Sequence, residues 1–121
     1  EAICVDVSFG YSPQCKKDDC GELSKGAMIG FSPVLDTTIS NELVKCAEKN
    51  GIPYQREIMS GKTGTNADVI SISKSGIRCG LISVPLRYMH TPSEVIDVKD
   101  VEAVADLIAA YIAERAGVCN A

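Results

Sequence analysis

The fold is decided by the stretch IRCGLISV, residues 77–84, which lies between Gly76 and Pro85. A short, almost continuously apolar run bounded by a glycine and a proline is typical of a strand that is covered on both faces of a sheet. We therefore predict that residues 77–84 form the central strand of this chain.

The segments around this stretch alternate between strand and helix patterns. Residues 2–9, 27–32 and 54–59 carry strand patterns, and helices are predicted between Asp36 and Gly51, between Thr65 and Gly76, and after Asp97. The order is strand, strand, helix, strand, helix, strand, helix. This order predicts an α/β fold, a layered sheet with helices on both faces.

Capping residues define the two later helices. Thr65 is the predicted N-cap of the short helix, with Asp68 as its capping partner, and Asp97 caps the last helix. Asp100 lies in the first turn of that helix, where the helix dipole favours a negative charge. The apolar stripe predicted to pack on the sheet comprises Val101, Val104, Ile108, Tyr111 and Ile112.

Length and charge narrow the classes of function. The 121 residues suit a single domain, the formal net charge is −4, and no basic cluster exceeds Lys16 and Lys17. We predict no nucleic-acid partner and no membrane partner, and a cytoplasmic location. The chain opens at Glu1 directly in strand sequence, and residues 2–9 look covered on both faces, so we expect a fragment with sequence missing before Glu1.

His90 is the only histidine, and it lies in PLRYMHTP, residues 85–92, just past the predicted central strand. The carboxyl edge of an α/β sheet is where ligands gather, and imidazole is a common metal ligand. A structural histidine packed in a loop is the alternative interpretation, because one histidine alone makes no metal site.

Asp6 interrupts the apolar strand AICVDVSF, residues 2–9. A carboxylate in a covered strand loses solvation and needs a cation, a donor network or a shifted pKa. An edge aspartate, or one paired with a lysine or an arginine, would explain it equally well.

The six cysteines do not form a disulfide framework. Cys4, Cys46 and Cys79 lie in apolar patterns and are predicted to be buried thiols, whereas Cys119 lies near the carboxyl end. Cys15 and Cys20 flank a charged part of the long loop between Gly10 and Gly26. Their spacing fits neither a zinc ribbon nor a redox Cys-x-x-Cys, and a disulfide between them is the more plausible alternative to a zinc site.

The turn GKTGTNA, residues 61–67, joins a strand to a helix but lacks the earlier glycine of a Walker motif. We therefore do not predict nucleotide binding. We interpret this turn as a segment whose backbone lines one side of a substrate site.

Four runs together resemble one family: VDVSF (5–9), ELSKG (22–26), IPYQ followed by GKTGTNA (52–55 and 61–67) and ISVPLRYMHTP (82–92). The chain resembles the M42 family of metallo-aminopeptidases, which includes glutamyl and deblocking aminopeptidases and proteins formerly labelled endoglucanase or cellulase M. The resemblance implies that residues 1–121 are the C-terminal part of a zinc-peptidase-like (phosphorylase/hydrolase-like) catalytic domain. The N-terminal part of that domain and the family's small inserted domain would be absent.

The resemblance implies a site with two divalent metal ions, zinc or cobalt. Asp6 would bind one ion and His90 the other, while Gly64, Thr65 and Arg87 would line the substrate; Arg87 could equally brace the loop of His90. The resemblance also implies peptide substrates and a homo-oligomer, a dodecamer. The family's adjacent glutamates, its other histidine and its bridging aspartate have no counterpart here, so we expect the chain alone to be inactive and to bind metal weakly.

Two other classes stay open at this point. A non-enzymatic α/β interaction or regulatory module would have Asp6 in a salt bridge and His90 as an ordinary loop residue. A glycosidase would need two carboxylates flanking a sugar cleft, and the sequence nominates no such pair.

Overall fold

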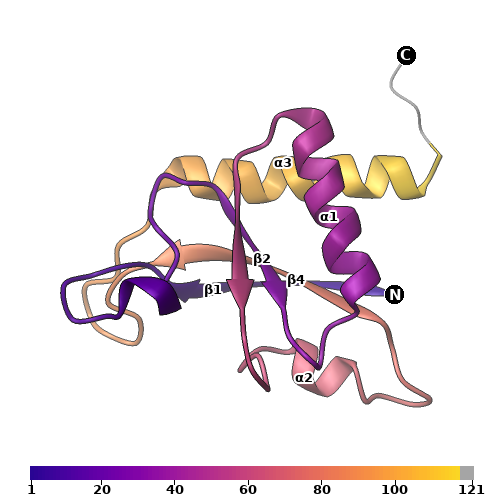
Figure 1. Ribbon diagram of the computed structural model, residues 1–121, viewed down its shortest axis with the longest axis horizontal. Helices are drawn as coiled ribbons and strands as arrows, with labels where there is room; N and C mark the ends of the chain where they lie inside the picture. The colour runs from indigo at the N-terminus through magenta and orange to yellow at the C-terminus, as the bar shows by residue number, and fades with distance from the viewer. Residues whose placement is uncertain (118–121) are drawn as a thin grey trace.

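The computed structural model describes residues 1–117 and shows a mixed sheet with helices packed on it (Figure 1). The strands are β1 (Ala2–Phe9), β2 (Ala27–Phe31), β3 (Tyr54–Ile58) and β4 (Cys79–Leu86). The helices are α1 (Thr37–Asn50), α2 (Ala67–Ile70) and α3 (Val98–Arg115), with a 3-10 turn η1 (Lys17–Asp19). The order of elements is the predicted one, apart from the short η1. None of the helices within residues 1–117 combines the length and the apolar character that a bilayer span requires.

β4 is the central strand, as predicted, although it begins two residues later than expected. The strand order is β1-β4-β2-β3, and every residue of β4 is buried. β4 runs parallel to β1 and antiparallel to β2, while β2 runs parallel to β3. Burial on both faces explains why the strand sequence is almost entirely apolar.

The two faces of the sheet are covered by different helices. α1 and α3 pack on one face, where Ile29 and Ile82 meet Leu43 and Leu107 in the larger core. α2 packs on the other face, where Ala67 contacts a smaller cluster that contains Cys4 and Leu81. The prediction of an α/β sheet with helices on both faces is therefore confirmed.

The ends of α1 follow from its sequence. The Asp36 side chain accepts a hydrogen bond from Ile39 N at 3.0 Å, and Gly51 ends the helix in the left-handed conformation at φ 64°. Arg78 binds the same carboxylate at 2.8 Å. The hydrogen bond from Arg78 and the one from Ile39 lower the pKa of Asp36 to about 2.

The short helix differs from its prediction. α2 ends at Ile70 rather than near Gly76, its N-cap is Asn66 rather than Thr65, and Asn66 makes no capping hydrogen bond through its side chain. Asp68 is not a capping partner of Thr65, because its carboxylate accepts hydrogen bonds from Thr63 N and Gly64 N. Thr65 N donates to Thr63 Oγ1 at 3.2 Å instead of to Asp68, and Thr65 Oγ1 accepts from Ala67 N at 3.2 Å, so no capping box forms.

The apolar stripe of α3 is also displaced from its prediction. The buried apolar residues of α3 are Ala103, Val104, Leu107 and Tyr111, whereas Val101 and Ile112 are exposed, Ile112 to 58%. Ile108 is partly buried against the larger core.

β1 lies at an edge of the sheet, so the expected covering of both its faces is not observed. Val5 is 53% exposed and Phe9 is 55% exposed. A groove between β1 and α3 is lined by apolar side chains, among them Ile3, Val5 and Ile112. Within residues 1–117, β1 pairs with β4 alone.

Asp100 fixes the start of α3 to the loop before β2. It is only 1% exposed, and its carboxylate accepts hydrogen bonds from Ser24 N at 2.8 Å and Gly26 N at 2.7 Å. Gly26 has φ 92°, and a Cβ on it would lie 2.0 Å from the carbonyl oxygen of Pro53. Asp97 caps α3, as predicted, through Lys99 N at 2.9 Å and also accepts a hydrogen bond from Ser24 Oγ.

We expect Asp100→Ala to lower the free energy of unfolding by about 3 kcal/mol, because two buried N–H groups lose a charged acceptor. Asp100→Asn should cost less, since one acceptor oxygen remains. Urea denaturation followed by circular dichroism measures both changes. The matched control is Asp106→Ala, an exposed position on the same helix, which should change stability by less than about 0.5 kcal/mol. Equal effects at positions 100 and 106 would contradict this account.

Candidate functional site

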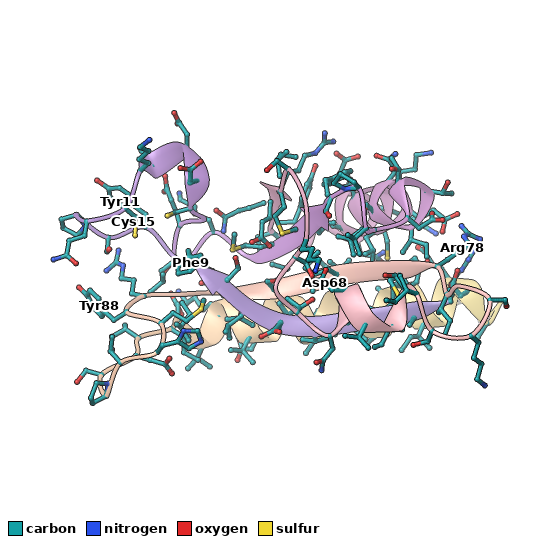
Figure 2. All side chains as sticks on the ribbon, turned by 90° about the horizontal axis from the view of Figure 1, so that it is seen from below. Phe9, Tyr11, Cys15, Asp68, Arg78 and Tyr88 are labelled. Atoms are coloured by element: carbon teal, nitrogen blue, oxygen red, sulfur yellow. The ribbon has the colours of Figure 1, made fainter. Side chains whose placement is uncertain are left out.

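The carboxyl ends of β1 and β4 meet at one edge of the sheet. The two strands are parallel, with Phe9 opposite Leu86, so the loops that follow them leave from the same place. Figure 2 shows Phe9, Tyr11, Cys15 and Tyr88 at this end of the molecule and Arg78 at the opposite end. Asp6 lies three residues before the end of β1, opposite Ser83, and His90 lies in the loop after β4.

The loop that carries His90 is closed on itself. Arg87 and Val95 exchange two backbone hydrogen bonds, at 2.9 and 3.1 Å, and His90 N donates to Glu94 Oε1 at 2.8 Å. Tyr88 and His90 both adopt left-handed backbone conformations, at φ 61° and 62°. Non-glycine residues hold such conformations only where their surroundings impose them. The His90 side chain is exposed at the surface of this closed loop.

Arg87 joins this loop to the long loop after β1. Its Nε donates to the carbonyl oxygen of Tyr11 at 2.8 Å, and the residue is half-buried. The bracing role that the sequence left open therefore has a direct contact to support it. The Nη groups of Arg87 make no hydrogen bond within residues 1–117, so they remain able to donate to another group.

Asp6 is a half-buried carboxylate without an ion pair among residues 1–117. Its Oδ1 accepts a hydrogen bond from Val7 N at 2.8 Å. The alternative in which a lysine or an arginine pairs with Asp6 therefore has no support in the described part of the chain, whereas the alternative of an edge aspartate fits, because β1 is an edge strand. Because side chains alternate along a strand, Asp6 shares its face with Cys4 and Ser8, the face on which α2 packs.

Glu57, which the sequence patterns did not single out, lies on this same face. Ser8 Oγ donates a hydrogen bond to Glu57 Oε1. Glu57 Oε2 and Ser83 Oγ are both buried and have no hydrogen-bond partner in the described residues. Burial raises the pKa of Glu57, the nearby Ser8 and Ser83 hydroxyls lower it, and the negative charge of Asp6 raises it further. We call Asp6, Ser8, Glu57 and Ser83 the polar cluster.

A sequence signal for Glu57 did exist. Residues two apart on a strand point to the same face, so Glu57 shares its face with Met59. Met59 packs against the smaller core, which places the Glu57 carboxyl on the covered face of β3. The neighbour of Glu57 on β2 is Gly30, where the side chains of Leu35 and Leu81 fill the space that a Cβ would take. An acid at a covered strand position loses solvation and needs a compensating partner, as Asp6 does.

Gly64 and Thr65 lie in the turn between β3 and α2. Asp68 organises this turn by accepting from Thr63 N, Thr63 Oγ1 and Gly64 N, each at 2.8 Å. Although burial raises it, these hydrogen bonds leave the pKa of Asp68 below its ordinary value. The turn leads into α2 on the sheet face of Asp6, but within residues 1–117 no hydrogen bond joins it to the loop of His90.

The donors present do not by themselves make a two-metal site. Carboxylate and imidazole are suitable ligands for zinc or cobalt, so Asp6 and His90 have the right chemistry. Within residues 1–117, however, no three side chains of histidine, cysteine, aspartate or glutamate come close enough together to hold a metal ion. This chain therefore supplies single donors rather than a complete coordination sphere.

Comparison with known proteins identifies a family. The family model described as M42 glutamyl aminopeptidase matches residues 1–107. A lysyl aminopeptidase from Pyrococcus furiosus is 33% identical over 112 residues, which cover 93% of this chain and 32% of that protein.

Solved structures give the same result. Aminopeptidase APDkam598 from Desulfurococcus kamchatkensis superposes with a TM-score of 0.83 at 33% identity, covering 91% of this chain and 33% of that chain. The Pyrococcus horikoshii TET1 peptidase, which assembles into a tetrahedron or a large octahedral shell, gives a TM-score of 0.67 at 26% identity, covering 89% and 32%. The chain thus spans about a third of the length of the relatives it matches.

We expect Glu57→Gln to raise the free energy of unfolding near neutral pH by about 1 kcal/mol. The amide keeps an acceptor for Ser8 and gains a donor for Ser83, without burying a charge. The pKa of Glu57 is higher in the folded protein than in the unfolded chain. The contribution of Glu57 to the free energy of unfolding is therefore most favourable at low pH, and it falls as the pH rises through the folded-state pKa. The variant should lose this part of the pH dependence.

Urea denaturation of both proteins between about pH 4 and pH 8 measures the difference. Glu102→Gln, an exposed exchange of the same chemistry on α3, is the control. A stability difference between the parent and Glu57→Gln that does not change with pH would show that Glu57 is not held in this way.

Proposed function

Because this chain belongs to the M42 glutamyl aminopeptidase family, we propose that it works as part of an aminopeptidase that releases N-terminal residues from peptides. The observation that carries the proposal is the family match over residues 1–107, which includes Asp6, the polar cluster and the loop of His90. The Asp6 carboxylate is compatible with it, because no ion pair within residues 1–117 occupies this group.

We propose Asp6 and His90 as ligands of two different divalent metal ions, zinc or cobalt. Two such cations would polarise the scissile carbonyl and make a water molecule a better nucleophile. The chain's own part is to hold its donors in place. Pairing with β4 fixes Asp6 in the sheet, and the Arg87–Val95 closure together with Glu94 fixes the backbone of His90.

The substrate would lie between the turn at Gly64 and Thr65 and the loop of His90. The turn is rigid, because Asp68 holds its N–H groups, and Gly64 is exposed without a side chain, so a peptide can approach the backbone closely. Arg87 is braced through Nε and keeps its Nη groups to donate to a substrate carbonyl or carboxylate. We also propose that the protein is a homo-oligomer, since the TET1 peptidase assembles into closed shells.

The function is tested on the complete product of the gene that encodes this chain. We expect it to release amino acids from aminoacyl-anilides, to lose activity with a chelator and to regain it with zinc or cobalt. Asp6→Asn and His90→Ala should each reduce kcat at least about 100-fold, because each removes a metal ligand. Asp106→Asn, on the exposed face of α3, is the matched control and should keep full activity.

Other outcomes assign the other classes. Full activity in both Asp6→Asn and His90→Ala would remove these residues from the site. Absence of any peptidase activity, with a stable partner protein instead, would favour the interaction module. Release of sugar from cellulose would favour the glycosidase.

The 121-residue chain alone should bind zinc and cobalt more weakly than micromolar at Asp6 and His90, because two donors from separate segments cannot surround a metal ion. Isothermal titration with a Cys15→Ser, Cys20→Ser variant avoids metal binding by those thiols. A stoichiometric micromolar site that disappears with Asp6→Asn would contradict this expectation.

A further inference from the structure

Two cysteines lie together in the loop between β1 and β2. We propose that Cys15 and Cys20 are a reversible dithiol–disulfide pair that exchanges with low-molecular-weight disulfides of the glutathione class. Both thiols are free and partly exposed in this structure, and Figure 2 shows Cys15 on the loop beside Tyr11, at the end of the sheet where Tyr88 also lies.

The loop already brings the two thiols together before any bond forms. Its base is closed by hydrogen bonds from Tyr11 N to Gly21 O at 2.6 Å and from Gly21 N to Phe9 O at 2.9 Å. The η1 turn then folds Cys20 back toward Cys15, so that the two thiols lie within interaction distance of each other. A disulfide here would close only a short ring, so it would stabilise the fold less than one that closes a long loop, and its partly exposed sulfurs are open to reduction.

The two thiols have different roles in the exchange. A hydrogen bond from Ser12, whose Oγ lies 3.4 Å from Cys15 Sγ, and one from Cys20 lower the pKa of Cys15, which makes it the attacking thiol. Burial, together with Cys15 itself, raises the pKa of Cys20 to about 11. Cys20 is therefore the second, resolving thiol.

The exchange takes place in two steps. The Cys15 thiolate attacks one sulfur of oxidised glutathione, the S–S bond breaks, and one glutathione leaves as a thiolate that takes a proton from water. Cys20 then gives its proton to solvent and attacks Cys15 Sγ, which expels the second glutathione as a thiolate that takes a proton from water. Two protein thiols are oxidised and one glutathione disulfide is reduced to two thiols. Once Cys15 is bonded, its negative charge no longer raises the pKa of Cys20, which eases the second step.

The other described cysteines should not compete. Cys4, Cys46 and Cys79 are buried, and burial raises the pKa of each thiol. Cys119 lies outside the described residues and is replaced by serine for the test.

The test equilibrates the Cys119→Ser chain with mixtures of reduced and oxidised glutathione, blocks free thiols and digests the protein with trypsin without reduction. Trypsin cleaves at Lys16 and Lys17, between the two cysteines, so the flanking peptides stay joined only if a disulfide links them. We expect a joined pair that has lost two hydrogen atoms and that separates again when reduced glutathione is in excess.

Two variants identify the cysteines that are joined. Because the first peptide also contains Cys4, Cys4→Ala should keep the link, whereas Cys15→Ser should abolish it. In a second measurement on the folded chain, iodoacetamide should modify Cys15 before Cys4, Cys46 and Cys79. The proposal is wrong if the peptides separate at every glutathione ratio, if Cys15 retains a stable glutathione adduct beside a free Cys20, or if the link survives Cys15→Ser.

Discussion

The complete burial of β4 is the constraint on which the rest of the structure depends. A strand that is buried on both faces and paired on both edges can carry no unsatisfied backbone group, so it must be the centre of a sheet. Because β1 runs parallel to it, Asp6 on β1 and the loop of His90 after β4 lie toward the same edge of the sheet. Its antiparallel neighbour β2 brings β3, and with it Glu57, to the same face as Asp6.

The two faces of the sheet have different chemical character. The face toward α1 and α3 is apolar, and it holds the larger core. The opposite face is apolar only beneath α2, and further along β1 and β4 it carries the polar cluster. Burying a carboxyl such as Glu57 costs stability, so its place near Asp6 supports the proposal that this face carries the site. Asp100, by contrast, is a buried acid with a structural role, because backbone N–H groups satisfy it.

The sequence predicted those features that depend on local chemistry. Asp36, Gly51 and Asp97 act on neighbouring backbone groups, so the ends of α1 and the start of α3 could be read directly. The features that were missed depend on distant partners. The stripe of α3 shifted because its contact with the sheet decides which side is buried. α2 ends at Ile70, where the chain passes into turns in which Ser73 N donates to Ile70 O and Gly76 N donates to Ser73 O. The contact of Glu57 with Ser8 could not be foreseen, because two other strands, β4 and β2, separate β3 from β1 in the sheet.

The open edge of β1 governs how this chain behaves in solution. Its outer backbone groups are free of ladder partners within residues 1–117, and the exposed Val5 and Phe9 side chains lie along the same strand. Such an edge is a template for another strand, and a net charge of −4 opposes close approach only at low ionic strength. Concentrated, salty solutions therefore favour colloidal association through β1, whereas dilute, low-salt conditions keep the molecules apart.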